Sequence, residues 1–297
     1  MNSMSVSPGG SSPSRLSRRK FILGSGVAAA GLAFYAGEIA RHEIDLVKTT
    51  ISVRDLPGAF HGFRIAQISD IHLDEFTEPF FLEHVVHRIN ELAPDLVLVT
   101  GDFVTRGSLT FIDSHHAAYR CAEILSTLKT PQVYTVLGNH DVSVSAPLVI
   151  EALNSKKIPV LVNQHVPIER GDSRIWLCGS DDAGTRRPDL NLTIPEKPDG
   201  PVLLMVHEPD YADTVIRHPR GKSVALMLSG HSHGGQVRIP FYGPLILPPM
   251  GQKYVMGHFR FDGIPLQLYV NRGIGSVGLP FRFDCPPELT LHTLQPA

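Results

Sequence analysis

The chain has 297 residues, a formal net charge of −2, 42% apolar residues and three cysteines. The near-neutral charge offers no electrostatic case for nucleic-acid binding, so we expect no nucleic-acid partner. The cysteines are few and their spacing fits no metal motif, which argues against a disulfide framework or a structural zinc site. The apolar content is ample for the core of one large α/β domain.

The first 40 residues form a region of their own. Positions 1–15 are rich in Ser, Gly and Pro, and Arg18-Arg19-Lys20 then precedes a run without charge from Phe21 to Gly37. Paired arginines before a mildly apolar run resemble a twin-arginine export signal. The alternative is a membrane anchor with a positive cytoplasmic flank. We therefore expect export by the twin-arginine machinery to the periplasm or the outer face of the cytoplasmic membrane. Residues 21–37 could stay as an anchor, and residues 41–297 form the folded domain.

Five short apolar runs in this domain, residues 64–69, 95–100, 132–137, 202–206 and 224–228, predict buried strands. Helical patterns separate several of them, including residues 79–92 and 146–154. Strands that alternate with helices pair in parallel, and their carboxyl ends then share one edge of the sheet, where ligands bind. Polar residues follow directly after each run: Asp70, His72, Asp102, Asn139, His140, Asp141, His207, His231 and His233. We expect these side chains to converge.

The residue types at this edge are suited to metal binding. They offer carboxylate oxygen, amide oxygen and imidazole nitrogen without thiolate, a set that favours Mn, Zn or Fe. There are too many candidate ligands for one ion, so we expect two divalent metal ions. A two-metal site serves attack on phosphorus, because it lowers the pKa of a bound water and neutralises charge on the phosphate.

The ordered series Asp-x-His, Gly-Asp, Gly-Asn-His-Asp, a single His after a strand, and Gly-His-x-His resembles the calcineurin-like metallophosphoesterase superfamily. The resemblance covers the chain from about Phe63 to the C-terminus. It implies an α/β fold, a four-layer sandwich of two mixed β-sheets flanked by helices. Each motif is weak alone, but the set in this order is specific.

The resemblance also implies a role for each residue. Asp70, His72 and His233 would hold the first metal, whereas Asn139, His207 and His231 would hold the second, with Asp102 bridging both. His140 would contact the phosphate and protonate the leaving oxygen, and Asp141 would orient His140 by accepting its ring N–H. One departure is Thr105, where many relatives carry Asp or Arg.

The export signal together with His207-Glu208-Pro209-Asp210 and the Gly-His-Ser-His-Gly-Gly-Gln-Val-Arg stretch resembles a small exported bacterial group. Some relatives of that group cleave UDP-2,3-diacylglucosamine in lipid A biosynthesis. We expect a dinuclear phosphodiesterase or pyrophosphatase whose phosphate-ester substrate is lipid-linked or belongs to the cell envelope. The alternatives are a phosphomonoesterase and a non-catalytic, metal-bound envelope binding protein.

An uncharged apolar segment, residues 239–250, follows the last histidine motif directly. Such a segment beside a phosphate site could hold an acyl chain or contact a membrane. The alternative is a covering hairpin packed on the edge of a sheet.

Overall fold

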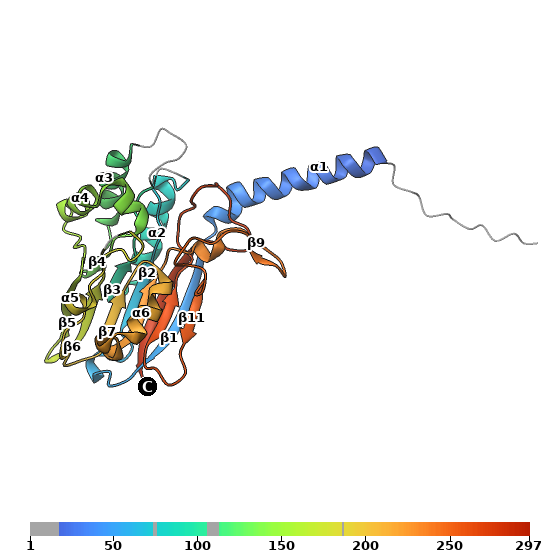
Figure 1. Cartoon of the computed structure of the whole chain (residues 1–297). Helices are drawn as coiled ribbons and strands as arrows, with labels where there is room; N and C mark the ends of the chain where they lie inside the picture. Colours follow the sequence, from blue (N-terminus) through green and yellow to red (C-terminus); the bar gives the residue numbers. More distant parts are fainter. Residues whose placement is uncertain (1–17, 74–75, 106–112, 186) are drawn as a thin grey trace, which may run out of the picture.

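The computed structural model describes residues 18–73, 76–105, 113–185 and 187–297. Two large mixed sheets lie face to face, with helices on their outer faces (Figure 1). The predicted α/β four-layer sandwich is confirmed.

The first sheet is formed, in spatial order, by β1 (Asp45–Val53), β13 (Glu288–Pro296), β2 (Arg64–Ile68), β3 (Leu96–Val99) and β4 (Val133–Thr135). The second is formed by β11 (Gly257–Arg260), β12 (Gln267–Val270), β8 (Val224–Ser229), β7 (Val202–Met205), β6 (Ser173–Gly179) and β5 (Gln164–Arg170). A separate hairpin pairs β9 (Arg238–Ile239) with β10 (Gly243–Pro244). The helices are α1 (Arg18–Phe34), α2 (Pro79–Leu92), α3 (Ser114–Leu125), α4 (Asn139–Ser155), α5 (Leu190–Thr193) and α6 (Ala212–Arg217), with short turns η1 (Tyr35–Ile39), η2 (Ala40–His42), η3 (Gly58–Phe60), η4 (Pro209–Tyr211), η5 (Pro219–Ser223) and η6 (His233–Gly235).

Alternation along the strands builds the layers, because successive side chains of a strand point to opposite faces. In β3, Leu96 and Leu98 pack between the sheets, whereas Val97 and Val99 face helices α2, α3 and α4. In β7, Leu203 likewise packs between the sheets, and its neighbour packs under α5 and α6. Both sheets are thus buried on two faces, which explains their nearly continuous apolar strands.

The parallel strands carry the predicted polar residues at their carboxyl ends. β2, β3 and β4 pair in parallel in the first sheet, and β6, β7, β8 and β12 do so in the second. Antiparallel pairs occur between β13 and β2, between β5 and β6, and between β11 and β12. The polar residues therefore come from two sheets rather than from one common edge.

Several predicted boundaries are wrong. The helix expected over residues 146–154 begins at Asn139 and is kinked at Ser145, where the backbone is extended. Residues 159–166 are also apolar enough to predict a strand, but the strand begins only at Gln164, because its partner in the hairpin, β6, fixes the register. The charged, Pro-rich composition of residues 181–200 predicts a surface loop, but this segment contains α5, which Asp189 caps by accepting the backbone N–H groups of Asn191 and Leu192. The three cysteines are free and buried.

One helix, Arg18–His42, is long and apolar enough to cross a membrane by length and composition. Its outer part, α1, projects from the domain and buries none of its side chains (Figure 1). Its base is attached firmly: the Arg41 guanidinium contacts the Glu78 carboxylate at 2.6 Å, and the Arg282 backbone N–H donates to the carbonyl of Ala36 at 3.0 Å. This N-terminal helix therefore has a fixed direction relative to the folded domain.

Candidate metal centre

The predicted site residues are brought together by five loops from the two sheets. Asp70 and His72 follow β2, Asp102 follows β3, and Asn139 and His140 follow β4 at the start of α4. From the second sheet, His207 follows β7, and His231 and His233 follow β8. Backbone hydrogen bonds connect these loops: the Asp70 N–H donates to the Gly101 carbonyl at 2.9 Å, and the Gly230 N–H donates to the His207 carbonyl at 3.0 Å.

The backbone turns sharply at the residues that carry the site. Asp70, His72, Asp102, His231 and His233 all have positive φ, between 47° and 70°. This left-handed region is uncommon for residues with a side chain, and it concentrates at functional sites. The turn at each strand end redirects the side chain out of the sheet and into the space between the loops.

The motifs require glycine at two positions where there is no room for a Cβ. A Cβ at Gly138 would lie 2.2 Å from Asp102 Oδ1, and a Cβ at Gly230 would lie 2.3 Å from Asp70 Oδ2. Both distances are far below van der Waals contact, so any side chain here would displace a carboxylate of the site. The Gly-Asn-His and Gly-His sequences thus reflect close packing of backbone against site carboxylates.

Asp70, His72 and His233 form one group of potential ligands, here called the first cluster. Their ligand atoms all lie within 4.8 Å of one another. His233 Nε2 is 3.3 Å from Asp70 Oδ1, and the Nε2 atoms of His72 and His233 are 3.1 Å apart. If neither nitrogen carries a proton, their lone pairs repel each other at this distance. A cation bound between the two rings would remove this repulsion.

Asp102, His207 and His231 form the second cluster, with the same spread of ligand atoms. Asp102 Oδ2 lies 3.2 Å from His207 Nε2 and 3.6 Å from His72 Nε2 of the first cluster. Its other oxygen, Oδ1, accepts the backbone N–H of His140 at 2.8 Å. One carboxylate oxygen of Asp102 therefore faces both clusters.

Carbonyl groups fix the orientation of two of these histidines. His207 Nδ1 lies 2.7 Å from the Thr100 carbonyl, and His231 Nε2 lies 2.8 Å from the Pro249 carbonyl. A carbonyl only accepts, so each of these nitrogens must carry the proton. The opposite nitrogen of each ring faces the cluster and can bind a metal ion when it carries no proton, as in many metal sites.

The electrostatics of the clusters favour bound positive charge. Burial opposes the charged form of His207, but the carboxylates of Asp102 and Asp70 outweigh this effect and raise the pKa of His207 well above its usual range. Burial lowers the pKa of His72 to about 3 and that of His231 to about 4, so these two rings are neutral ligands at pH 7. Burial also raises the pKa of Asp70 to about 6.

The residues therefore fit two divalent cations. The donor set of imidazole nitrogen and carboxylate oxygen suits Mn, Fe or Zn. Among the described residues, Asn139 Oδ1 is buried and has no hydrogen-bond partner, and such an orphaned acceptor is costly unless a cation or a donor satisfies it. Asn139 borders the same space as Asp102 and His231.

One predicted contact is wrong. Asp141 does not accept the ring N–H of His140, because both oxygens of its buried carboxylate are taken by four backbone N–H groups. These belong to Gly138 and to residues 102–104, so Asp141 holds the turn at Asp102 against the start of α4. His140 Nδ1 is buried without a hydrogen-bond partner among the described residues. The His140 ring contacts the His72 ring edge to face, with centroids 4.9 Å apart.

Two further residues beside the clusters could hardly be recognised from the sequence alone. Thr105, the departure from the common pattern, places its hydroxyl 2.6 Å from His72 Nδ1 and so orients that ring. Arg282 is fully buried and donates to the carbonyls of Arg272, Gly273 and Cys285. Burial, and next to it the charges of His72 and Arg282, hold the pKa of His233 well below its usual value. An anionic substrate could also meet Arg106, which follows Thr105, or Arg186 and Arg187 of the charged loop. Arg106 and Arg186 lie outside the described residues, and Arg187 is exposed.

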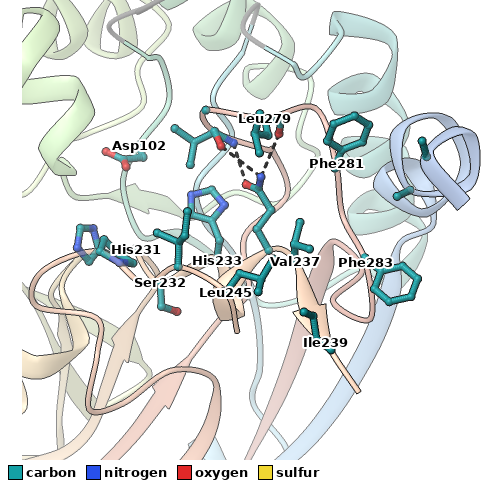
Figure 2. Close-up of a pocket in the computed structure, with 18 of the residues that line it drawn as sticks. Asp102, His231, Ser232, His233, Val237, Ile239, Leu245, Leu279, Phe281 and Phe283 are labelled. Atoms are coloured by element: carbon teal, nitrogen blue, oxygen red, sulfur yellow. Dashed lines mark hydrogen bonds between the residues drawn. The ribbon is translucent and has the colours of Figure 1, made fainter. Parts of the chain in front are cut away.

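A large apolar cavity of about 990 Å³ opens from the clusters (Figure 2). Asp102, His140, His231 and His233 lie at its polar end. The rest, here called the groove, is lined almost entirely by apolar side chains: Val237, Ile239, Pro240, Leu245, Ile246 and Pro248 from the hairpin segment, Val277, Leu279, Phe281 and Phe283 from the loop before β13, and Ala29, Leu32, Ala33 and Ala36 from the N-terminal helix. The hairpin pairs with neither large sheet and leaves Phe241 and Ile246 exposed, which does not support a hairpin packed on a sheet edge.

Comparison with known proteins agrees with this geometry. Residues 63–235 match the model of the family described as calcineurin-like phosphoesterase. The chain is 35% identical to the uncharacterized metallophosphoesterase YkuE of Bacillus subtilis, over 95% of this chain and 98% of that protein. It is 29% identical to the phosphodiesterase YaeI of Escherichia coli, over 94% of this chain and 99% of that protein. It is 28% identical to the UDP-2,3-diacylglucosamine pyrophosphatase LpxG of Chlamydia trachomatis, over 84% of this chain and 89% of that protein.

Proposed function

The chain belongs to the calcineurin-like phosphoesterase family, and on that premise we propose that it cleaves a phosphodiester or pyrophosphate bond of a lipid-linked substrate. The coarser activity, metal-dependent hydrolysis of a phosphoric ester, follows from the family and from its phosphodiesterase and pyrophosphatase relatives. The observation that carries the finer proposal is one cavity with two ligand clusters at one end and an apolar groove at the other.

The proposed roles follow the geometry of the clusters. Asp70, His72 and His233 would hold one cation, and Asn139, His207 and His231 the other, with Asp102 between them. Two divalent cations bound there supply a water of lowered pKa and neutralise charge on the phosphate. The carbonyls of Pro249 and Thr100 accept from one ring nitrogen of His231 and His207, which leaves the other nitrogen of each ring to bind a cation.

His140 is the proposed acid of the reaction. It lines the cavity beside Asp102, and its backbone N–H is fixed by the Asp102 carboxylate at 2.8 Å. Its Nδ1 has no partner among the described residues, so that ring can donate a proton to a leaving oxygen without first breaking a protein hydrogen bond. Asp141 acts on the site through the backbone: its four amide contacts hold the Asp102 turn and the start of α4 together.

The test uses the full chain in detergent, purified without chelator. We expect two metal ions per chain by mass spectrometry and hydrolysis of bis-p-nitrophenyl phosphate faster than of the monoester. Asp102→Ala should lose metal and activity, whereas the matched change Asp113→Ala, at the exposed cap of α3, should lose neither. Faster turnover of the monoester would favour a phosphomonoesterase. A folded protein with two metals and no turnover of either ester would favour a binding protein instead.

We further propose that the domain lies outside the cytoplasm. The support is the apolar helix Arg18–His42, whose cationic flank, Arg18-Arg19-Lys20, is at the end away from the domain. Positive residues favour the cytoplasmic side of a membrane helix. In spheroplasts, external protease should reach the wild-type domain. The double change Arg18→Lys and Arg19→Lys should protect it if the twin-arginine machinery exports it, whereas Arg54→Lys, on the exposed domain surface, should not. Unchanged digestion of the double variant would argue against that export route.

A further inference from the structure

The N-terminal helix is more than an attachment, because one of its faces borders the cavity that contains the metal centre. Ala29, Leu32, Ala33 and Ala36 line the groove. Their spacing of i, i+3, i+4 and i+7 places them on one stripe of the helix. Ala30, between them in sequence, points away from this stripe and does not line the groove.

The opposite wall is the hairpin segment and the loop before β13. Figure 2 shows Val237, Ile239 and Leu245 on the hairpin side, with Phe281 and Phe283 between them and the helix. The loop is held in place by Gln236, whose Nε2 donates to the Leu279 carbonyl at 3.0 Å while its Oε1 accepts the Val277 N–H at 2.9 Å. The wall is thus a built surface with a fixed shape.

The helix base packs closely against this wall. A Cβ at Gly37 would lie 3.1 Å from the Phe281 ring, so the glycine lets the helix approach the loop. The backbone hydrogen bond from Arg282 to Ala36 fixes the same contact. The helix therefore cannot swing away at this point without breaking contacts of the domain.

The helix residues that line the groove lie at depths that the hydrocarbon core of a bilayer would cover. Lys20 and Arg41 are 21 residues apart, about 31 Å along a helix, close to the roughly 30 Å of a hydrocarbon core. Ala36 and Ala29 then lie about 7.5 Å and 18 Å below Arg41. The hairpin next to them presents Phe241, Tyr242 and Ile246 to the surroundings, Ile246 with 78% of its side chain surface exposed. Apolar and aromatic side chains exposed together in this way are typical of a membrane contact.

We propose that Ala29, Leu32, Ala33 and Ala36 of the N-terminal helix form one wall of the substrate site, which binds the alkyl chain of a membrane phosphodiester while its phosphate lies at the metal clusters. This rests on the proposed function and assigns the substrate's chain a place in the fold. The argument for this occupant is continuity: the groove opens directly from Asp102, His140 and His231. The chain enters between helix and hairpin, so the substrate need not leave the bilayer.

The test uses alkyl p-nitrophenyl phosphates, from methyl to hexyl, with the full chain in phospholipid vesicles loaded with Mn. For each protein, the measured quantity is kcat/KM for the hexyl ester divided by kcat/KM for the methyl ester. Burial of each methylene can raise kcat/KM up to about fourfold. We expect a ratio of roughly tenfold or more in the wild type and in Ala30→Phe. Ala33→Phe, which fills the groove from the helix, should reduce the ratio to about one, and Ile246→Gln on the other wall should reduce it in part.

Each outcome separates the two proposals. If Ala33→Phe hydrolyses the methyl ester and shows the same hexyl-to-methyl ratio of kcat/KM as Ala30→Phe, the helix does not form a wall of the substrate site. The phosphodiesterase proposal would remain intact. A hexyl-to-methyl ratio of about one in the wild type would overturn the proposal that the groove binds the alkyl chain. No hydrolysis of the methyl ester by the metal-loaded wild type would overturn both. Because Ala30 and Ala33 are both on a helix without buried side chains, neither change should prevent folding.

Discussion

Gly230 tests most directly whether close packing of backbone positions the metal centre. A Cβ in Gly230→Ala would lie 1.9 Å from Ser69 Oγ and 2.3 Å from Asp70 Oδ2. Neither partner can move easily: both side chains are fully buried, and the Asp70 carboxylate accepts the His231 N–H at 3.0 Å. Relief of the contacts therefore requires a shift of more than about 1 Å at Asp70 or at the His231 loop.

The expected cost has two parts. Overpacking in a filled interior reduces the free energy of unfolding by about 1–3 kcal/mol, so the domain should still fold. With a urea slope of about 2 kcal/mol per M, the unfolding midpoint should fall by about 0.5–1.5 M. A displacement of about 1 Å at a reacting centre costs on the order of 100-fold in turnover. The first cluster should also lose metal, because Asp70 supplies one of its three potential ligands.

The assay compares Gly230→Ala with Gly58→Ala, whose added Cβ would meet no atom within 4 Å. Urea midpoints are measured in EDTA, and metal content and turnover of bis-p-nitrophenyl phosphate are measured after Mn is added. Gly58→Ala should match or slightly exceed the wild type in stability, because it lowers the entropy of the unfolded chain. A Gly230→Ala protein with two metals and turnover within twofold of Gly58→Ala would refute the packing argument.

Three further predictions concern single side chains. His140→Ala should retain both metals and lose about 10²–10⁴-fold in turnover, as expected for a general acid; loss of metal in that variant would count against this role. Thr105→Val removes the hydroxyl 2.6 Å from His72 Nδ1 and should weaken metal binding about 10–100-fold in a chelator competition, whereas Thr105→Ser should not. Burial lowers the pKa of His292 to about 3. As the pH falls, this histidine is therefore protonated in the unfolded chain before it is protonated in the folded chain. Its contribution to stability is complete above about pH 6.5 and is lost as the pH falls toward 3, by at most about 1.4 kcal/mol per pH unit; in metal-free protein, His292→Gln should reduce this slope in urea titrations, and an unchanged slope would contradict it.

Much of the fold could be predicted from local pattern. The continuous apolar strands β3 and β7 and the helix Pro79–Leu92 follow from periodicity, because a strand buried on both faces and an amphipathic helix each have a distinct pattern. Strand β11 and the shifted start of β5 could not be found in this way. Both are edge strands whose register is set by the antiparallel partner, β12 or β6, rather than by their own residues.

The ligand candidates could be recognised from sequence because each follows an apolar strand and carries a suitable donor. Their orienting partners could not. The carbonyls of Thr100 and Pro249 carry no residue-specific signal, and Asp141 contacts backbone N–H groups where a side-chain partner was expected. Arg282 stands between two phenylalanines in sequence, yet its guanidinium is fully buried among carbonyls.

The sequence by itself determined the α/β class, the donor types and the order of the motifs, because these depend on composition and on spacing along the chain. The arrangement in two sheets was expected from the family resemblance alone. Only the tertiary structure decided that three loops of one sheet and two of the other meet at the metal centre. It alone placed the apolar segment after His233 opposite the N-terminal helix, more than 200 positions earlier in the chain. The reason is physical: a groove is a property of surfaces brought together by packing, and no local pattern in either segment records the other.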